Sequence, residues 1–401
     1  MKNHINAFSA PCSGCGACVS ACPKEAIKVS LDKEGVYTAT VDESRCVDCG
    51  QCKTVCMRLD TSSCLPLSSG TIVAAQSSNA ATVKKCTSGG IAYEMSKYAF
   101  KNGMGILGVI YDYETNRAVS CIAKTEEDIE RFRGSKYIQS YTADAFREML
   151  AEMKNDSTRK YLAFGTPCQI YGLAKLLEKH HMRDRAILVD LFCHGVPSYR
   201  VWDQYLESLK AQLGTNRLTE VVFRDKSIGW HNFVIKLQSD KGEYKEASEG
   251  DLFYHAFFDN VLFSEACFDC AVRKAVSKAD LRLGDYWGKR YQHREDGISA
   301  VLLCTERGKA FLEQIKDQLI CFEAGSVDEV MASQSVHIYA TKTYRQNAFF
   351  DLQQGKSLQK TIESYRKLFP APKRVKLFVK ESTAKLPDGM RATIRKIYKK
   401  L

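Results

Sequence analysis

No uninterrupted apolar run in the 401-residue sequence approaches the roughly 18 residues that a helix needs to cross a bilayer. Residues Met1 to Pro11 are polar and mixed, so they lack the charged and then apolar pattern of an export signal. These two absences exclude an obvious membrane span and a secretory leader. We therefore expect a cytoplasmic protein.

The body of the chain also lacks a strong excess of one charge. The net charge is +11, but ten Lys and Arg against two acidic residues give +8 between Lys373 and Leu401, which leaves +3 for the rest. A nucleic-acid-binding domain usually carries a basic patch or stripe. The nearly neutral body therefore argues against a nucleic-acid partner.

Cysteine, in contrast, is abundant. A chain with 17 Cys and no export signal is expected to use them for metal in a reducing compartment, not for disulfides. Eight of these residues form two copies of the pattern Cys-x2-Cys-x2-Cys-x3-Cys at a constant offset of 34 residues. The first copy is Cys12, Cys15, Cys18 and Cys22, and the second is Cys46, Cys49, Cys52 and Cys56.

This spacing is typical of bacterial ferredoxins, in which the fourth Cys of each run ligates the cluster of the other run. We predict two 4Fe-4S clusters, one held by Cys12, Cys15, Cys18 and Cys56 and the other by Cys46, Cys49, Cys52 and Cys22. Gly14, Gly16 and Gly50 allow the backbone to curl close to the sulfurs. The alternative is a pair of zinc knuckles, but four-Cys zinc sites are usually built from two separated Cys-x2-Cys pairs.

The sequence divides into segments of different composition. We predict a ferredoxin-type domain at 1–62, a Ser-rich linker at 63–80, a central domain at 81–325 with a possible division near residue 155, and a helical extension with a basic tail at 326–401. The predicted fold class is an α+β two-cluster module followed by a mixed α/β domain. The segment 280–288 is predicted to be a turn.

A β–α–β pattern in the central domain indicates a third site. Strands are predicted at 160–165 and 186–192, with Cys168 after the first and Cys193 after the second. If the strands are parallel, both thiols lie at the sheet edge where open α/β sheets bind ligands. With Cys267 and Cys270 they could form a four-thiolate site. The alternative is two buried Cys plus a redox-active Cys-x2-Cys pair.

Two Gly-containing loops are candidates for binding an anion. Ser88, Gly89 and Gly90 precede a helix at 91–100, whose N-terminus is suited to an anion, although a plain N-cap has the same pattern. The basic loop at 131–140 contains Gly134-Ser135-Lys136-Tyr137, which suits the phosphates and ring of a cofactor as well as it suits an ordinary loop. The basic, partly apolar tail could contact a membrane or an acidic partner, or be a solvated helix.

The combined order of motifs resembles the family of beta subunits of coenzyme F-420 hydrogenases and dehydrogenases. After the two-cluster module come Thr-Ser-Gly-Gly, Gly-Ser-Lys-Tyr, Gly-Thr-Pro-Cys-Gln, Phe-Cys-His-Gly, Phe-Arg-Asp-Lys, Cys-x2-Cys and Gly-Asp-Tyr-Trp-Gly, from Cys12 to about Glu323. The resemblance implies an FAD in the central domain and a 4Fe-4S cluster beside it. It raises the third-cluster assignment, and it implies flavin contacts from Ser88, Gly89, Gly90, Gly134, Ser135, Lys136 and Tyr137.

The expected function is that of an iron–sulfur flavoprotein oxidoreductase. It would pass electrons between a ferredoxin or other redox protein and a small-molecule substrate, deazaflavin-like or other, because clusters carry single electrons and a flavin carries one or two. His194 and Asp285 are candidate proton donors near the flavin, with structural roles as the alternative. Two other functions stay open: an electron-transfer subunit with no substrate of its own, and a redox sensor with a Cys267–Cys270 disulfide.

Overall fold

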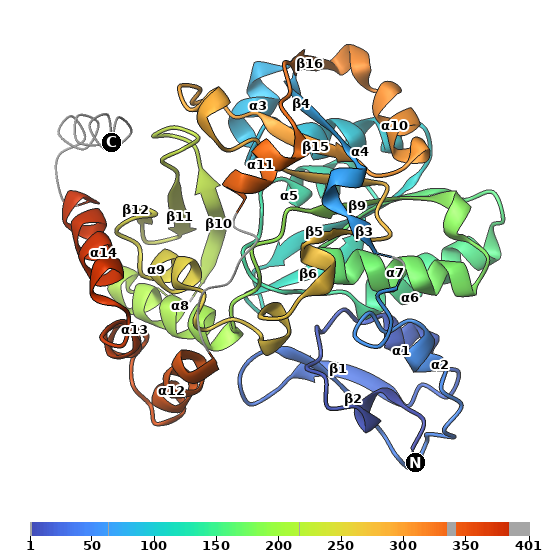
Figure 1. The fold of residues 1–401 in the computed structure, drawn as a ribbon, viewed down its shortest axis with the longest axis horizontal. Coiled ribbons are helices and arrows are strands. Elements are labelled where there is room, and N and C mark those ends of the chain that lie inside the picture. The colour runs from blue at the N-terminus through green and yellow to red at the C-terminus, as the bar shows by residue number, and fades with distance from the viewer. Residues whose placement is uncertain (1, 63, 216, 335–341, 385–401) are drawn as a thin grey trace. The chain divides into compact units, whose positions relative to one another are not determined.

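The computed structural model describes residues 2–62, 64–215, 217–334 and 342–384, and these divide into two compact units (Figure 1). Unit 1 contains the described residues of Met1–Val196, Gly229–His231 and Ser264–Ile338, and unit 2 contains those of Pro197–Ile228, Asn232–Phe263 and Tyr339–Leu401. The basic segment 385–401 lies outside the described residues. Among the helices of the described ranges, none has the length and apolar character of a membrane span.

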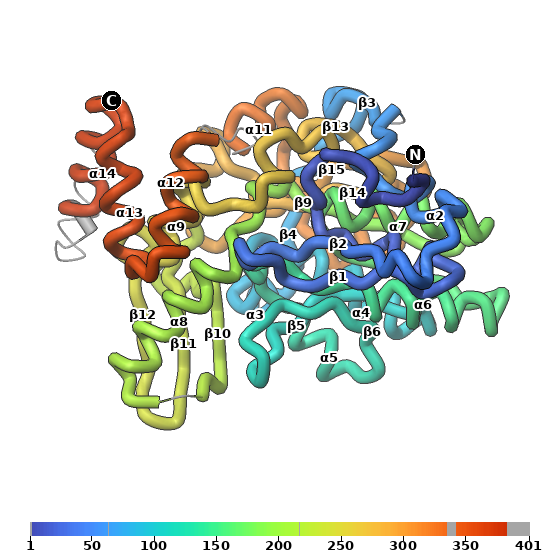
Figure 2. The backbone as a smooth tube through the Cα atoms, turned by 90° about the horizontal axis from the view of Figure 1, so that it is seen from below, coloured from blue at the N-terminus to red at the C-terminus, as the bar shows by residue number. Residues whose placement is uncertain are grey.

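Unit 1 begins with the predicted ferredoxin module. Strands β1 (Ile27–Leu31) and β2 (Tyr37–Val41) pair antiparallel, with Ile27 opposite Val41, which confirms the predicted hairpin. Two short helices, α1 (Ala17–Ala21) and α2 (Gln51–Thr54), each follow a Gly in the left-handed conformation, Gly16 at φ 76° and Gly50 at φ 71°. Figure 1 shows α1 and α2 below the sheet domain, and Figure 2 shows the hairpin in front of it.

A nine-stranded mixed sheet is the scaffold of unit 1 within the described residues. Its strands, in spatial order, are β16 (Leu319–Phe322), β4 (Thr71–Ser77), β15 (Ser299–Leu303), β14 (Leu281–Asp285), β9 (Ala186–Leu191), β8 (Tyr161–Phe164), β5 (Gly105–Asp112), β6 (Arg117–Ile122) and β7 (Ser140–Tyr141). Strands β14, β9, β8 and β5 are parallel to one another, whereas β14 pairs antiparallel with β15. The mixed α/β class is thus confirmed.

Two segments differ from the prediction. The segment 280–288, predicted to be a turn, contains β14, because Leu281 and Leu283 alternate into the buried core between β9 and β15. The second half of the predicted linker 63–80 contains β4, which lies between β16 and β15 and buries Ala74 and Ala75 completely. The short apolar run at 72–75 was predicted to belong to the linker, because a strand buried on both faces lacks the alternating pattern of a half-buried strand.

Helices cover both faces of this sheet. They are α3 (Ala80–Lys85), α4 (Ile91–Lys101), α5 (Glu126–Phe132), α6 (Ala143–Asn155), α7 (Pro167–Lys179), α10 (Glu306–Glu313) and α11 (Val327–Ser333). Leu162 of β8 packs in the cluster that includes Met95 of α4, whereas the hydroxyl of the adjacent Tyr161 donates to Glu152 of α6. Because neighbouring strand residues point to opposite faces, α4 and α6 lie on opposite sides of the sheet.

Unit 2 combines a small sheet with five helices in its described part. Its elements are α8 (Tyr199–Leu213), β10 (Leu218–Asp225), β11 (Val234–Ser239), β12 (Glu243–Ala247), α9 (Leu252–Asp259), α12 (Lys342–Gln353), α13 (Leu358–Arg366) and α14 (Ala371–Ala384). The three strands form an antiparallel sheet in the order β10-β11-β12. Trp202, Phe223 and Phe253, all buried, pack against one another in tilted and edge-to-face geometry with ring centroids 5.0 to 5.7 Å apart.

Candidate iron–sulfur and flavin sites

Four cysteines of the ferredoxin module gather as predicted for its first cluster. Cys15 and Cys18 are buried, and the thiols of Cys12 and Cys56 lie close enough to both to affect their titration. Burial raises the pKa of Cys15 to about 12, and the neighbouring Cys56 and Cys12 contribute in the same direction. This grouping is the one that the crossed ligand pattern of a two-cluster ferredoxin requires.

Three of the other four cysteines share a second neighbourhood. Burial raises the pKa of Cys52, and the nearby Cys22 and Cys49 raise it further, so these three share one neighbourhood. Cys49 is exposed, while Cys46 and Cys22 are partly buried. The second set of cysteines therefore has one exposed thiol, whereas the first set has none.

The local backbone suits sulfur ligands. The N–H of Gly14 donates to Cys12 Sγ, and the N–H of Ala26 donates to Cys22 Sγ, both at 3.3 Å. Such N–H donors stabilise negative charge on cluster sulfurs. No group of three or more His, Cys, Asp or Glu in the described ranges is arranged to hold a single metal ion. A cubane takes one thiolate at each of its irons, so its ligands do not converge on one point.

Glycines also allow the sheet domain to approach the first group closely. A Cβ on Gly14 would lie 2.5 Å from the amide nitrogen of Gln139, and one on Gly16 would lie 2.6 Å from Thr142 Oγ1. In return, Gln139 Nε2 donates to the carbonyl of Ser13 at 2.9 Å, and Thr142 Oγ1 donates to the carbonyl of Cys15 at 2.8 Å. The ligand loop is thus fixed by the segment that leads into α6.

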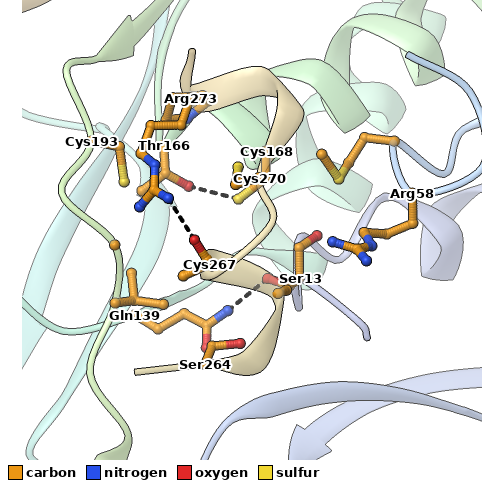
Figure 3. A pocket seen from close by; sticks show the side chains of 15 residues that line it. Ser13, Arg58, Gln139, Thr166, Cys168, Cys193, Ser264, Cys267, Cys270 and Arg273 are labelled. Atoms are coloured by element: carbon orange, nitrogen blue, oxygen red, sulfur yellow. Dashed lines mark hydrogen bonds between the residues drawn. The ribbon is translucent and has the colours of Figure 1, made fainter. Parts of the chain in front are cut away.

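The structure brings Cys168, Cys193, Cys267 and Cys270 to the lining of one pocket (Figure 3). Cys168 lies in the first turn of α7, after β8, and Cys193 follows β9. These strands are parallel, which is the condition that the sequence argument required, so both thiols lie at their carboxyl ends. The ferredoxin module contributes Ser13, Met57 and Arg58 to the lining, two short 3-10 turns contribute Ala266 and Arg273, and Gln139 comes from the segment before β7. A four-thiol donor set around one space fits a third 4Fe-4S cluster.

Burial dominates the titration of three of these thiols. It raises the pKa of Cys193 to about 11 and that of Cys267 to about 12, and it raises the pKa of Cys168 well above its ordinary value. The neighbouring Cys270 adds to the shift of Cys168, and so does Cys15 of the ferredoxin module. The thiol site therefore lies beside the first ferredoxin group.

Two guanidinium groups provide positive charge at this pocket. Arg273 donates to the carbonyl of Cys267 at 2.6 Å and to that of His194 at 3.2 Å, and so it links the two loops that carry thiols. Arg58 reaches toward the pocket from the ferredoxin module (Figure 3), and its Nε is shielded from solvent without a hydrogen-bond partner in the described ranges. Both cations would offset the negative charge of a cluster with four thiolates.

A buried ion pair lies next to the site of Cys168, Cys193, Cys267 and Cys270, and the sequence did not predict it. Arg282 of β14 donates through two nitrogens to the carboxylate of Asp190 in β9, each at 2.6 Å, and both side chains are almost completely buried. Arg282 also donates to the carbonyls of Val272 and Arg273, just after the Cys267–Cys270 loop. Burial lowers the pKa of Arg282, but the Asp190 charge outweighs burial and raises it overall. An Asp inside the buried strand 186–192 was the available signal.

Helix α7 connects the thiol site to the first ferredoxin group. Cys168 is its second residue, and Gly172 lies four residues later, on the same helix face. A Cβ on Gly172 would lie 3.1 Å from Cys15 Sγ and 2.9 Å from the Cβ of Ala17. The absence of a side chain at Gly172 therefore lets α1 and Cys15 pack directly on α7.

The two predicted flavin loops lie next to each other. The N–H of Ser135 donates to Thr87 Oγ1 at 2.9 Å, which joins the loop before α4 to the loop after α5. Gly134 has φ 79°, and a Cβ there would meet no atom within 4 Å, so this part of the loop is open. Gly90 also has a left-handed φ of 87° and precedes α4 directly.

Several of the predicted flavin-binding groups have partners within the chain. The ammonium of Lys136 donates to the carbonyls of Arg131, Phe132 and Arg133 at 2.9 to 3.1 Å, and so it caps the C-terminus of α5. Burial lowers its pKa to about 7. The hydroxyl of Ser88 donates to the carbonyl of Ile298, and the N–H of Gly89 donates to Ser299 Oγ. These groups have partners within the chain, and the flavin contacts predicted for Tyr137 and the other residues stay a prediction.

The two candidate proton donors occupy different places. His194 follows Cys193 beside the thiol site, where its carbonyl accepts from Arg273. The carboxylate of Asp285 accepts from the indole N–H of Trp230 at 2.5 Å, and its carbonyl accepts from Gln334. Trp230 stacks on Trp287 with ring centroids 4.8 Å apart. The contacts of Asp285 suit a structural role, and a catalytic role for either residue stays a prediction.

Comparison with family models covers both the module and the sheet domain. Residues 11–58 match a model described as a 4Fe-4S dicluster domain. Residues 72–147 match the model for the N-terminal part of the coenzyme F420 hydrogenase/dehydrogenase beta subunit, and residues 158–328 match the model for its C terminus. The chain belongs to the family of coenzyme F420 hydrogenase/dehydrogenase beta subunits. The family predicted from the motifs is thereby confirmed, together with an iron–sulfur domain.

Two curated proteins and one solved structure align with this beta-subunit homologue at 21 to 26% identity. The chain is 24% identical over 325 residues to a subunit of the F(420)H(2) dehydrogenase of Methanosarcina mazei, covering 78% of this chain and 84% of the relative. It is 26% identical over 193 residues to the uncharacterized protein MJ1349 of Methanocaldococcus jannaschii, covering 41% of this chain and about half, 52%, of that protein. A chain of the F420-reducing NiFe hydrogenase complex from Methanosarcina barkeri aligns with a TM-score of 0.47 and 21% identity, over 72% of this chain and 94% of the other.

Proposed function

We propose that the protein is an iron–sulfur flavoprotein oxidoreductase that passes electrons between a redox protein and a small-molecule substrate. It would use the two clusters of the ferredoxin module, a third 4Fe-4S cluster at Cys168, Cys193, Cys267 and Cys270, and FAD. The substrate class is a deazaflavin or another molecule that accepts or donates two electrons. The family membership supports this substrate class, and the cofactors support the reaction type.

The observation that carries the proposal is the contact of α7 with both cluster sites. This helix holds Cys168 in its first turn, and its Gly172 packs against Cys15. Electrons that leave the first ferredoxin group therefore have a nearby acceptor site. A free ferredoxin would need no second site of this kind.

The exposure of the cysteines supports an order for the clusters. The group that contains Cys49 faces solvent, and the group that contains Cys15 faces α7. The proposed route runs from an outside donor to the cluster of Cys46, Cys49, Cys52 and Cys22, then to that of Cys12, Cys15, Cys18 and Cys56, and then to the third site. Electrons that flow in the reverse direction would pass the same clusters in the opposite order.

FAD fits the proposal through the adjoining loops at Thr87 and Ser135, which lie next to the segment that binds the ferredoxin module. When bound, FAD would supply the exchange between single-electron and two-electron chemistry. The phosphates of FAD would lie in the open space beside Gly134 and at the N-terminus of α4. His194 and Asp285 remain the candidates for proton transfer.

Anaerobic purification with iron, sulfide and flavin counts tests the proposal directly. Three cubanes predict about 12 Fe per chain, and two predict about 8. We expect about 12 Fe and one FAD in the native protein, and about 8 Fe in a Cys168→Ser/Cys267→Ser variant. Cys321→Ser is the matched control, because Cys321 is an exposed thiol on β16 away from all three groups. A native count near 8 with intact FAD rules out the third cluster.

A pH–rate profile tests the two candidate proton donors. If His194 or Asp285 moves a proton in the rate-limiting step, His194→Ala or Asp285→Asn loses one limb of the profile. A profile with both limbs retained in the two variants assigns both residues to structural roles.

The second candidate function is that of an electron-transfer subunit within a larger complex, with no substrate of its own. The exposed cluster group supports it, and the named relative from Methanosarcina mazei is itself a dehydrogenase subunit. The two functions differ in the behaviour of the purified protein. Dithionite-reduced protein that reduces no small molecule, but does so when a partner subunit is added, supports the second function against the first.

A further inference from the structure

Helix α14 has one side that faces its own unit. This side carries Lys373, Leu377 and Glu381, which are half-buried and spaced four residues apart, so they share one helix face. The ammonium of Lys373 lies 3.6 Å from the centre of the Phe369 ring, and Arg366 pairs with Glu381 at 2.5 Å. These contacts hold the helix against α13 within unit 2.

The opposite side of α14 exposes large apolar side chains. Val375 is 62% exposed and Phe378 is 71% exposed, the two highest values for large hydrophobic residues in the described part of the chain. They lie three residues apart, so they share one face, and the partly exposed Val379 continues it. An exposed Phe beside an exposed Val on one helix is unusual for a surface that contacts only water.

The charges around this apolar face have one sign. Arg374 lies on one flank and Lys376 on the other, both exposed, whereas the acid in the described part of α14, Glu381, is paired on the inner side. The sequence that follows continues the trend, because residues 385–401 contain six Lys and Arg against one acid. A partner of this face is therefore anionic and also accepts apolar side chains.

We propose that the exposed face of α14 binds the surface of an anionic lipid bilayer. Phe378 and Val375 enter the boundary between headgroups and acyl chains, and Arg374 and Lys376 contact lipid phosphates. A bilayer supplies mobile anionic groups next to an apolar layer, so it matches a central apolar stripe with basic flanks. This inference rests on α14 alone, and it holds or fails independently of the cofactors.

Vesicle flotation of the anaerobically purified holoprotein tests the proposal. We expect co-flotation with vesicles of phosphatidylcholine and phosphatidylglycerol, little with phosphatidylcholine alone, and release at high salt. Val375→Ser/Phe378→Ser is expected to weaken binding roughly tenfold or more, because the apolar contact is lost. Phe350→Ser is the matched control, because Phe350 is 59% exposed on α12 in the same unit. This variant is expected to bind vesicles as the native protein does.

A charge-reversed variant and a shortened chain complete the experiment. Arg374→Glu/Lys376→Glu is expected to abolish flotation, and a chain that ends at Ala384 is expected to keep weaker binding that still requires phosphatidylglycerol. Iron content in every variant reports an intact unit 1, and far-UV circular dichroism reports that the helices of unit 2 are intact. Equal binding to both vesicle types, an equal loss in Phe350→Ser, or no flotation at all overturns the proposal. Binding to polyglutamate without flotation also overturns it and identifies an acidic protein partner instead.

Discussion

At the scale of single residues, Gly172 has a measurable role. In an unconstrained helix, Gly→Ala stabilises by about 1 kcal/mol. Here the new Cβ would lie 3.1 Å from Cys15 Sγ and 2.9 Å from Ala17, so α1 has to move. We expect Gly172→Ala to alter the EPR signal of the first ferredoxin cluster and to lower iron occupancy there. Glu178→Ala, at an exposed position of the same helix, is the control. An unchanged signal would show that α7 and Cys15 are not in contact.

The Asp190–Arg282 pair gives a second prediction at this scale. Breaking a buried ion pair by removing one partner costs about 3–5 kcal/mol, because the remaining charge stays buried. Arg282→Met is therefore expected to lower the free energy of unfolding by this amount and to loosen the loop after Cys270, since Arg282 also binds the Val272 carbonyl. The double variant Asp190→Ala/Arg282→Met is expected to be less destabilised than the sum of the two single variants. Denaturant unfolding of all three variants measures this coupling, and simple additivity would contradict it.

At the scale of elements, the N-cap of α9 predicts a pH dependence. Asp251 is fully buried, and its carboxylate accepts from the N–H of Tyr254 and from the hydroxyls of Tyr205 and Tyr244. Burial raises the pKa of Asp251 from 3.8 to about 6, although these hydrogen bonds oppose the shift. Because the folded protein binds this proton more tightly than the unfolded chain does, the stabilising effect is complete below about pH 4 and is lost as the pH rises through about 6.

This loss amounts to about 3 kcal/mol for a shift of about two units. We expect Asp251→Asn to remove that part of the pH dependence, since Asn caps helices about as well as Asp and has no proton to lose. Denaturant titrations followed by tryptophan fluorescence between about pH 4 and 7 measure it. The same slope in the variant and the native protein would assign the pH dependence to other groups.

The elements also show how far the sequence predicts the structure. Periodicity predicted the β1–β2 hairpin and the β8–α7–β9 unit, because those signals are local. It did not predict β14, because Asp280 to Gly288 contains the Gly and Asp residues of a turn, and only the neighbours β9 and β15 make it a strand. The role of Lys136 as a helix cap was also out of reach, because local sequence suits a phosphate equally well.

The site divides in the same way. Cys spacing predicted that Cys15 and Cys18 lie near Cys12 and Cys56, and the β–α–β pattern predicted that Cys168 and Cys193 lie at one sheet edge if the strands are parallel. The Asp190–Arg282 support and the contact between Gly172 and Cys15 join residues about a hundred or more positions apart, and no local pattern contains that information. Long-range packing decided these parts of the site.

At the scale of the whole molecule, the order of the clusters predicts different effects of two ligand variants. Cys49→Ser is expected to slow reduction of the remaining clusters by a reduced ferredoxin, because Cys49 belongs to the exposed group, while dithionite still reduces them. Cys15→Ser is expected to leave the exposed cluster reducible by the ferredoxin and to cut off the third site. Stopped-flow bleaching of iron–sulfur absorbance measures both, with Cys321→Ser as the control. Equal rates with ferredoxin in Cys49→Ser and the native protein would contradict the order.

The structure of α7 has a consequence for the rate of the proposed electron transfer between the site of Cys168 and the group of Cys15. Cys168 and Gly172 are one helical turn apart, a rise of about 6 Å along a hydrogen-bonded axis, and no hinge separates them. Motions within α7 therefore leave the gap between the two sites unchanged while Gly172 stays packed against Cys15. Electron transfer across α7 is expected to follow the difference in reduction potential and to be insensitive to solvent viscosity.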